Sequence, residues 1–273
     1  MKVMSDPRRL EQQVALVTGG AAGLGLAIAR RFVAEGAQVV ISDIQRECGV
    51  EVARQDGLHF IEQNVCDEAG WPRVIEEIDR RFGRLTILVN NAGIVGPTQQ
   101  VDPENTLLVD WRRTFAVNVE GTFLGCRSAI PAMRSAGGGS IINISSVAAL
   151  LATPDAAAYG ASKAAVRQLT KSVAQYCAER KLNIRCNSLH PGMVRTELWE
   201  SLAREQARLR NMSVEEMVRE DQARVPLGDF TLPADVAAAA AFLASADSRH
   251  MTGAKLVVDG GLKYCDTYQA PKP

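Results

Sequence analysis

Tyr159 and Lys163 are the residues of this sequence whose types and spacing most directly suggest chemistry. They are four positions apart in a stretch whose pattern predicts a helix, so their side chains would share one face. An ammonium about 5 Å from a phenolate stabilises it by roughly 3 kcal/mol at an effective dielectric near 20, which is about two pKa units. We therefore expect Lys163 to lower the pKa of Tyr159 toward about 8, where a tyrosine can act as a general base.

A glycine-rich turn follows the first predicted strand, Val14–Thr18, and leads into a predicted helix. Its sequence over 18–25 is T-G-G-A-A-G-L-G. Glycines let the backbone approach a pyrophosphate closely, and the helix N-terminus stabilises the negative charge. Asp43, after the second predicted strand, could accept hydrogen bonds from both hydroxyls of an adenosine ribose, and it could also cap the next helix. These residues predict a dinucleotide site.

Short apolar runs alternate with longer helical patterns from residue 14 onward. The runs lack apolar–polar alternation, which indicates strands buried on both faces and therefore a parallel sheet. We predict one α/β domain over residues 1–273, a Rossmann-like doubly wound sheet of about seven parallel strands with helices on both faces. The expected strands are Val14–Thr18, Gln38–Ser42, Leu58–Glu62, Leu85–Val89, Ser140–Ser145, Asn183–Ser188 and Lys255–Val258, and the expected helices lie near 24–35, 45–55, 68–82, 108–134, 158–180 and 233–245.

The stretch 193–231 departs from this alternation, because it has no predicted strand and mixes Met, Leu and Trp with many charges. Two short amphipathic helices would suit its pattern. It follows the carboxyl end of a strand, where doubly wound sheets bind ligands, so we expect a substrate lid. A surface excursion or a subunit contact is the alternative.

Several motifs in register resemble the short-chain dehydrogenase/reductase family over about 14–262. The resemblance implies a nicotinamide-dependent oxidoreductase in which Ser146 holds the substrate oxygen, Lys163 holds the nicotinamide ribose, and Asn118 binds a water that links the lysine to solvent. The family's serine precedes the tyrosine by thirteen residues, which selects Ser146 over Ser145. The matching residues are T-G-x-x-x-G-x-G over 18–25, Asn90-Asn91-Ala92-Gly93, Asn118, Ser146, Tyr159-x-x-x-Lys163, Pro191-Gly192, Thr196 and Asp259-Gly260-Gly261.

The resemblance also implies a cofactor site and a homotetramer in which the helices at 108–134 and 158–180 form one interface. Asp43 would repel a 2′-phosphate, so we expect NAD(H) to be preferred, although Arg46 could reach the phosphate. Asn64-Val65 stands where the family often has Asp-Val, so the adenine contact should be altered. The expected cofactor-binding residues are Gly19, Ala22, Gly23, Leu24, Gly25, Asp43, Ile44, Asn64, Val65, Asn91, Ala92, Gly93, Tyr159, Lys163, Pro191, Gly192, Val194 and Thr196.

The residues expected near the substrate are mostly apolar: Val95, Ser146, Val147, Met193 and Trp199. With Leu198 and Leu202 at helical spacing beside Trp199, they suit a mainly apolar secondary alcohol, cyclic or steroid-like. The three insertion residues could instead only pack the insertion against the body or another subunit. Two other functions stay open: an NADPH-dependent 3-oxoacyl ketoreductase, and a non-catalytic nucleotide-sensing regulator on the same fold.

The composition excludes other classes of protein. Lys and Arg number 31, as do Asp and Glu, so bulk charge does not predict binding to nucleic acid or to an acidic membrane. The six cysteines show no disulfide framework and no metal-ligand spacing, so we expect no metal. The apolar stretch 236–246 is too short to span a bilayer, and residues 1–11 lack the apolar core of a signal peptide. We therefore expect a cytoplasmic protein.

Overall fold

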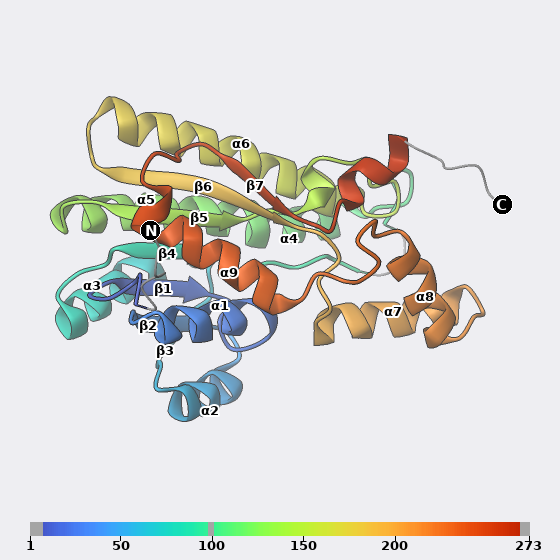
Figure 1. The fold of residues 1–273 in the computed structure, drawn as a ribbon, viewed down its shortest axis with the longest axis horizontal. Helices are drawn as coiled ribbons and strands as arrows, with labels where there is room; N and C mark the ends of the chain where they lie inside the picture. The colour runs from blue at the N-terminus through green and yellow to red at the C-terminus, as the bar shows by residue number, and fades with distance from the viewer. Residues whose placement is uncertain (1–7, 98–100, 268–273) are drawn as a thin grey trace, which may run out of the picture.

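The computed structural model describes residues 8–97 and 101–267, and within them one parallel sheet carries the fold (Figure 1). Its seven strands lie in the order β3-β2-β1-β4-β5-β6-β7, which confirms the predicted sheet. Strand β6 runs three residues beyond its predicted end, because Leu189, His190 and Pro191 continue its pairing with β7. The strands are β1 (Val14–Thr18), β2 (Gln38–Asp43), β3 (His59–Glu62), β4 (Ile87–Asn90), β5 (Gly139–Ile144), β6 (Ile184–Pro191) and β7 (Lys255–Val258).

Helices cover both faces of the sheet, since alternate strand residues enter two separate cores. Ala15 and Val17 of β1 pack in the core that includes α1 and α9, whereas Val14 and Leu16 pack in the core that includes α3, α5 and α6. The helices of the sheet layers are α1 (Gly23–Ala34), α2 (Arg46–Asp56), α3 (Gly70–Phe82), α4 (Leu108–Phe115), α5 (Gly121–Ser135), α6 (Ala157–Glu179) and α9 (Pro233–Ala244).

The predicted helix at 108–134 is not continuous. A π-helical segment, Ala116–Glu120, separates α4 from α5 and contains Asn118. Such segments relax the helical ladder and are frequent at functional sites. Short 3₁₀ turns occur at Val147–Ala149, Ala246–Ser248 and Leu262–Thr267.

The stretch 193–231 forms two helices, α7 (Glu197–Leu209) and α8 (Val214–Ala223), as its pattern predicted. They lie together beyond one end of the sheet (Figure 1). Ala203, Ala207 and Met217 form a small core of their own, against which Trp199 and Met212 pack. In the described part of the chain, no helix is long and apolar enough to cross a membrane.

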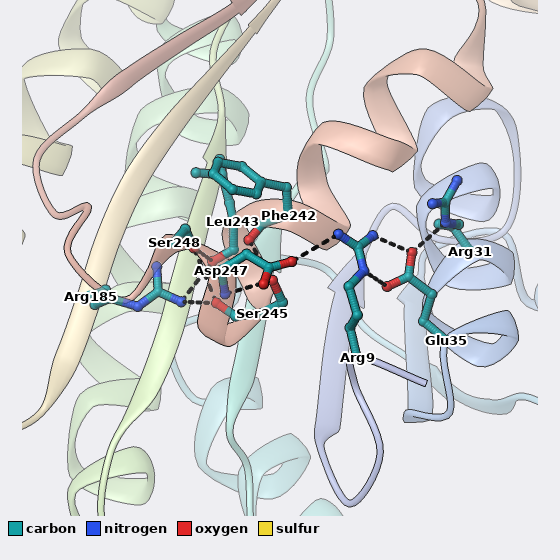
Figure 2. A network of polar contacts seen from close by, with 9 residues as sticks. All are labelled: Arg9, Arg31, Glu35, Arg185, Phe242, Leu243, Ser245, Asp247 and Ser248. Atoms are coloured by element: carbon teal, nitrogen blue, oxygen red, sulfur yellow. Dashed lines mark hydrogen bonds and ion pairs between the residues drawn. The ribbon is translucent and has the colours of Figure 1, made fainter. Parts of the chain in front are cut away.

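A charged network joins the residue that follows α1 to the 3₁₀ turn that follows α9 (Figure 2). Arg9 binds Glu35 through two hydrogen bonds of 2.6 and 2.8 Å and reaches Asp247 at 3.2 Å. Arg31 adds a third bond to Glu35. Burial alone would raise the pKa of Glu35, but the two guanidinium groups hold it below its usual range.

Candidate active site

Three glycines shape the turn between β1 and α1. Gly19 and Gly23 have φ of +62° and +54°, left-handed values that favour glycine. A Cβ at Gly25 would overlap the carbonyl oxygen of Gly19, so α1 packs on the turn more closely than a side chain allows. Beside Gly23, no described atom lies within 4 Å of the Cβ position. Among the described residues, no side chain caps the start of α1 at Ala22. Free backbone N–H groups beside an open space fit a dinucleotide pyrophosphate.

Asn91 fastens this turn to the end of β4. Its Nδ2 donates to the carbonyl oxygens of Thr18 and Gly19, at 2.9 Å each. The hydroxyl of Thr18 in turn accepts from the backbone nitrogens of Asn91 and Ala92, at 3.1 Å each. The side chain of Asn91 therefore positions the turn, because both of its N–H donors are already used.

Asp43 ends β2 directly beside the turn. Its Oδ2 accepts from the backbone nitrogen of Ala21 at 3.2 Å, and its Oδ1 accepts from that of Gln45 at 3.0 Å. Gln45 occupies the N-cap position of α2, so Asp43 does not cap that helix. Each carboxylate oxygen keeps a further acceptor site for a ribose hydroxyl. Ile44, the next residue, is exposed.

Asn64 has its side-chain orientation fixed by its neighbour. Oδ1 accepts from the backbone nitrogen of Cys66 at 3.0 Å, and only an oxygen can accept there. The amide group that remains is therefore Nδ2, a donor. Val65 is buried, and its carbonyl oxygen accepts from Nε1 of Trp71 at 3.0 Å.

Ser146, Tyr159 and Lys163 meet beyond the end of β5. Ser146 precedes the 3₁₀ turn Val147–Ala149, and the other two residues belong to α6. The side chain of Ser146 acts on Tyr159 and lowers the pKa of its hydroxyl. Lys163 is buried, donates from Nζ to the carbonyl oxygen of Ile144 at 3.0 Å, and lies 5.6 Å from the centre of the Tyr159 ring. A Cβ at Gly93 would be 3.3 Å from Nζ, so the chain after β4 passes beside the lysine.

The pKa of Tyr159 contradicts the expectation from sequence. Burial raises this pKa, and the hydrogen bond with Ser146 only partly opposes the rise. Burial also lowers the pKa of Lys163 to about 8. The expected lowering fails because desolvation penalises the phenolate and the ammonium alike, and because Nζ lies over the ring and donates to Ile144.

Ser145 and Asn118 hold the surrounding backbone. The hydroxyl of Ser145 donates to the carbonyl oxygen of Lys163 at 2.9 Å. Asn118 accepts from the backbone nitrogen of Ile94 at 2.8 Å and donates to the Ile94 carbonyl at 2.9 Å and to Ser162 Oγ at 3.0 Å. The side chain of Asn118 is thus a clamp between the loop after β4 and α6.

The motif after β6 supports the insertion. A Cβ at Gly192 would lie 2.8 Å from Cα of Asp259, so the two chains approach as closely as glycine permits. Pro191 is the last residue of β6, and Val194 pairs with Thr231 in an isolated bridge. Thr196 caps α7, since its hydroxyl accepts from the backbone nitrogen of Trp199 at 3.2 Å.

Two adjoining cavities of about 160 and 320 Å³ lie between α4, the chain after β4, α6 and α7. Tyr159 is on the wall of the smaller one, and Gly93 is on the wall of the larger one. Of the expected substrate residues within the described ranges, Val95 lines both cavities, but Ser146, Val147, Met193 and Trp199 line neither. Leu202 is the apolar side chain that α7 contributes to both.

Trp199 instead packs against Phe230, with ring centres 4.6 Å apart, and against the small core of α7 and α8. Trp199 therefore packs within the insertion itself, which is neither the expected substrate contact nor the alternative of packing against the body or another subunit. Met212 and Met217 belong to the same small core. The side chain of Leu198 lies outside the described residues.

Sequence reasoning missed the polar part of the cavity walls. Thr106, Asp110 and Thr114 line the smaller cavity, and Arg113 lines the larger one. A usable signal was present, because Asp110, Thr114 and Asn118 recur every four residues and so share one helical face.

A parallel sheet of this order, a glycine-rich turn after β1 and a Ser–Tyr–Lys group beside a cavity define the class of dinucleotide-dependent oxidoreductases with a doubly wound fold. Comparison with known proteins narrows that class. A family model described as enoyl-(acyl carrier protein) reductase matches residues 19–263.

Curated relatives match almost the whole chain. The NADP-dependent (R)-specific alcohol dehydrogenase of Lentilactobacillus kefiri is 40% identical over 258 residues, covering 93% of this chain and 97% of the relative. The 3-beta-hydroxysteroid dehydrogenase of Comamonas testosteroni is 40% identical over 256 residues, with the same coverage of each chain. The 2-(R)-hydroxypropyl-CoM dehydrogenase of Xanthobacter autotrophicus is 41% identical over 254 residues, covering 91% and 97%. The chain belongs to the short-chain dehydrogenase/reductase family, as its motifs predicted.

Proposed function

We propose that the protein interconverts a mainly apolar secondary alcohol, cyclic or steroid-like, and its ketone by hydride transfer with NAD(H). The observation that carries the proposal is that Tyr159 lies on the wall of a cavity, with Nζ of Lys163 5.6 Å from the centre of its ring and with the side chain of Ser146 acting on its pKa. The relatives from Lentilactobacillus kefiri and Comamonas testosteroni are an alcohol dehydrogenase and a hydroxysteroid dehydrogenase by name, which supports the reaction class.

Tyr159 serves in this proposal as the acid and base. A nicotinamide held beside this group would supply the acceptor or the donor of hydride. Ser146 holds the substrate oxygen. The phenolate of Tyr159 takes the alcohol proton in oxidation, and the Tyr159 hydroxyl returns it in reduction. Since burial raises the pKa of Tyr159, the protonated form that reduction needs dominates near neutral pH, and oxidation should speed up as the pH rises.

Lys163 and Asn118 position the reacting groups. Lys163 donates one N–H to the Ile144 carbonyl, and its two other N–H groups are available to hold the nicotinamide ribose. Asn118 fixes the loop after β4 through Ile94, and a water that links Lys163 to solvent remains part of the proposal. Both roles rest on the resemblance together with these contacts.

The preference for NAD(H) rests on Asp43. Its carboxylate stands at the end of β2, where it can accept from both ribose hydroxyls and repels a 2′-phosphate. Arg46, the cation nearest in sequence, pairs with Glu62 at 3.5 Å. The Lentilactobacillus kefiri relative is NADP-dependent by name, so the ratio of activities with the two cofactors is the quantity to measure. We propose that the cofactor is held by Gly19, Ala22, Gly23, Leu24, Gly25, Asp43, Ile44, Asn64, Val65, Asn91, Ala92, Gly93, Tyr159, Lys163, Pro191, Gly192, Val194 and Thr196.

A homotetramer is part of the same proposal, with α4, α5 and α6 forming one interface. Exposed apolar side chains on or beside these helices support it, namely Leu107, Leu108, Val109, Phe123 and Tyr176. A cytoplasmic location would suit both the cofactor and the reduced thiols.

The test is a panel of cyclic and steroid alcohols, with hexitols as the polar comparison, assayed with NAD+ and NADP+ on wild type and Tyr159→Phe. We expect the cyclic alcohols to have the higher kcat/KM and the variant to lose about 10²–10⁴-fold in kcat, the usual contribution of general acid–base catalysis. NADH binding, followed by fluorescence, should survive in the variant. Turnover of hexitols with better kcat/KM, or a variant as active as wild type, would refute the proposal.

A further inference from the structure

Thr114 has a buried hydroxyl for which residues 8–97 and 101–267 supply no hydrogen-bond partner. Threonines in helices commonly donate to the carbonyl four residues earlier. Thr122 and Thr170 of this chain do so at 2.8 Å. Since Thr114 makes no such bond, its hydroxyl can turn toward another partner without breaking an existing contact, and leaving it unpaired is unfavourable.

Thr114 is one of the residues that line both cavities. Threonine in a helix divides between two χ1 rotamers, so rotation about χ1 brings the hydroxyl to the place that the methyl group holds. The backbone of Gly96, at φ +102°, passes so close that a Cβ there would lie 3.3 Å from Thr114 Oγ1. The chain after β4 therefore lies close to the Thr114 hydroxyl.

Asp110 lies one helical turn before Thr114 and lines both cavities as well. Asp155 adds a second carboxylate to the wall of the smaller cavity, where Tyr159 also lies. Neither carboxylate has an ion pair with any residue that the structure describes. The wall around Tyr159 thus offers acceptors, which attract a hydrogen-bond donor and repel an anion.

We propose that Asp110 and Thr114 form a recognition point for a second hydroxyl of the substrate, so that the preferred substrates are alicyclic diols and their hydroxyketones. This inference rests on the proposed function, in which Tyr159 exchanges a proton with the first hydroxyl. Asp110 accepts from the second hydroxyl, and Thr114 donates to it. The carbon skeleton of the substrate, between its two hydroxyls, packs on Val95 and Leu202, which line the cavity.

The test compares trans-1,4-cyclohexanediol with trans-4-methylcyclohexanol, which replaces the second hydroxyl by a methyl group. Wild type, Thr114→Val and Thr170→Val are each assayed for kcat/KM with NAD+, and for the Kd of each compound by calorimetry. We expect the diol-to-methyl ratio of kcat/KM to fall about 10-fold in Thr114→Val, the factor that corresponds to ~1.4 kcal/mol, and the Kd preference to fall equally.

Thr170→Val is the matched control, because its buried hydroxyl donates to Val166 and accepts from Asn143, away from both cavities. It should lower Tm and leave the ratio unchanged, whereas Thr114→Val should not lower Tm. The diol has two equivalent carbinol groups, so without a subsite the wild-type diol-to-methyl ratio of kcat/KM would be near two. If the ratio is near two and Thr114→Val leaves it unchanged, the subsite is overturned, whereas turnover of these alcohols still upholds the proposed function. If the protein binds the diol preferentially, loses this preference in Thr114→Val and turns over neither alcohol, the subsite is upheld and the proposed function is overturned. If there is neither turnover nor preferential binding, both fail.

Discussion

Nδ1 of His190 lies 2.9 Å from the carbonyl oxygen of Ser146. A carbonyl only accepts, so Nδ1 carries the hydrogen in this contact, and Nε2 faces the hydroxyl of Ser188 at 2.9 Å. Burial lowers the pKa of His190 to about 4, which keeps the imidazole neutral. The end of β6 thereby holds the backbone of Ser146.

The first prediction concerns stability and pH. Because the pKa of His190 in the folded protein is about 4 and lies below the unfolded value of about 6.5, the unfolded chain binds more protons between these values. The contribution of the neutral imidazole is fully present above pH 6.5 and is lost as the pH falls toward 4, by about 3 kcal/mol at most. Urea unfolding at pH 7 and pH 4.5 measures this loss.

His190→Asn is the variant for comparison, since the amide can still donate to the Ser146 carbonyl but does not titrate. We expect its free energy of unfolding to fall less than that of wild type between the two pH values. Equal losses in the two proteins would show that His190 does not titrate as its burial implies.

The two adjacent serines should separate activity from stability. Ser146→Ala removes the hydroxyl that acts on Tyr159 and holds the substrate oxygen in the proposal, and it should lower kcat about 10²-fold or more. Ser145→Ala removes one bond to the Lys163 carbonyl and should cost about 1 kcal/mol of stability with a much smaller change in kcat. Steady-state kinetics and urea unfolding of both variants decide this, and the reverse order would mean that Ser145 is the serine at the reacting oxygen.

Asp43 should control the choice of cofactor. Asp43→Asn keeps the shape and removes the charge, so kcat/KM with NADP+ should rise because the repulsion of the 2′-phosphate is lost. Asp43→Ala also removes the acceptors of the Ala21 and Gln45 nitrogens, so kcat/KM with NAD+ should fall about 10-fold or more. Parallel kinetics with both cofactors check these outcomes, and an unchanged NAD+/NADP+ ratio in both variants would remove Asp43 from the explanation.

Asn64 should weaken the hold on adenine. Its oxygen accepts from Cys66, so its remaining Nδ2 would face the 6-amino group of a bound adenine, donor to donor. Asn64→Asp offers a second oxygen, and the Kd for NADH should fall several-fold, measured by fluorescence titration. The hypoxanthine analogue, with a 6-oxo group, should respond in the opposite direction; a change in the same direction for both would argue against this contact.

The sequence by itself determined the sheet, the glycine-rich turn and the shared face of Tyr159 and Lys163. Each of these depends on spacing within a few residues, and the seven predicted strands and the two helices of the insertion follow from the same local periodicity. The choice of Ser146 over Ser145 rests on the thirteen-residue spacing to Tyr159 in the family that the sequence resembles, and it stays a prediction.

Only the tertiary structure decided the pKa of Tyr159, the neighbours of Trp199 and the position of Thr114 on a cavity wall. Spacing set the distance from Tyr159 to Lys163, but desolvation of the phenol depends on β5 and on the chain after β4, which are distant in sequence. An apolar Trp199 would suit a substrate pocket or a packing contact equally well, and only its packing on Phe230 in the structure distinguishes the two. Burial is a sum over neighbours that folding brings together, so no local pattern in the sequence specifies it.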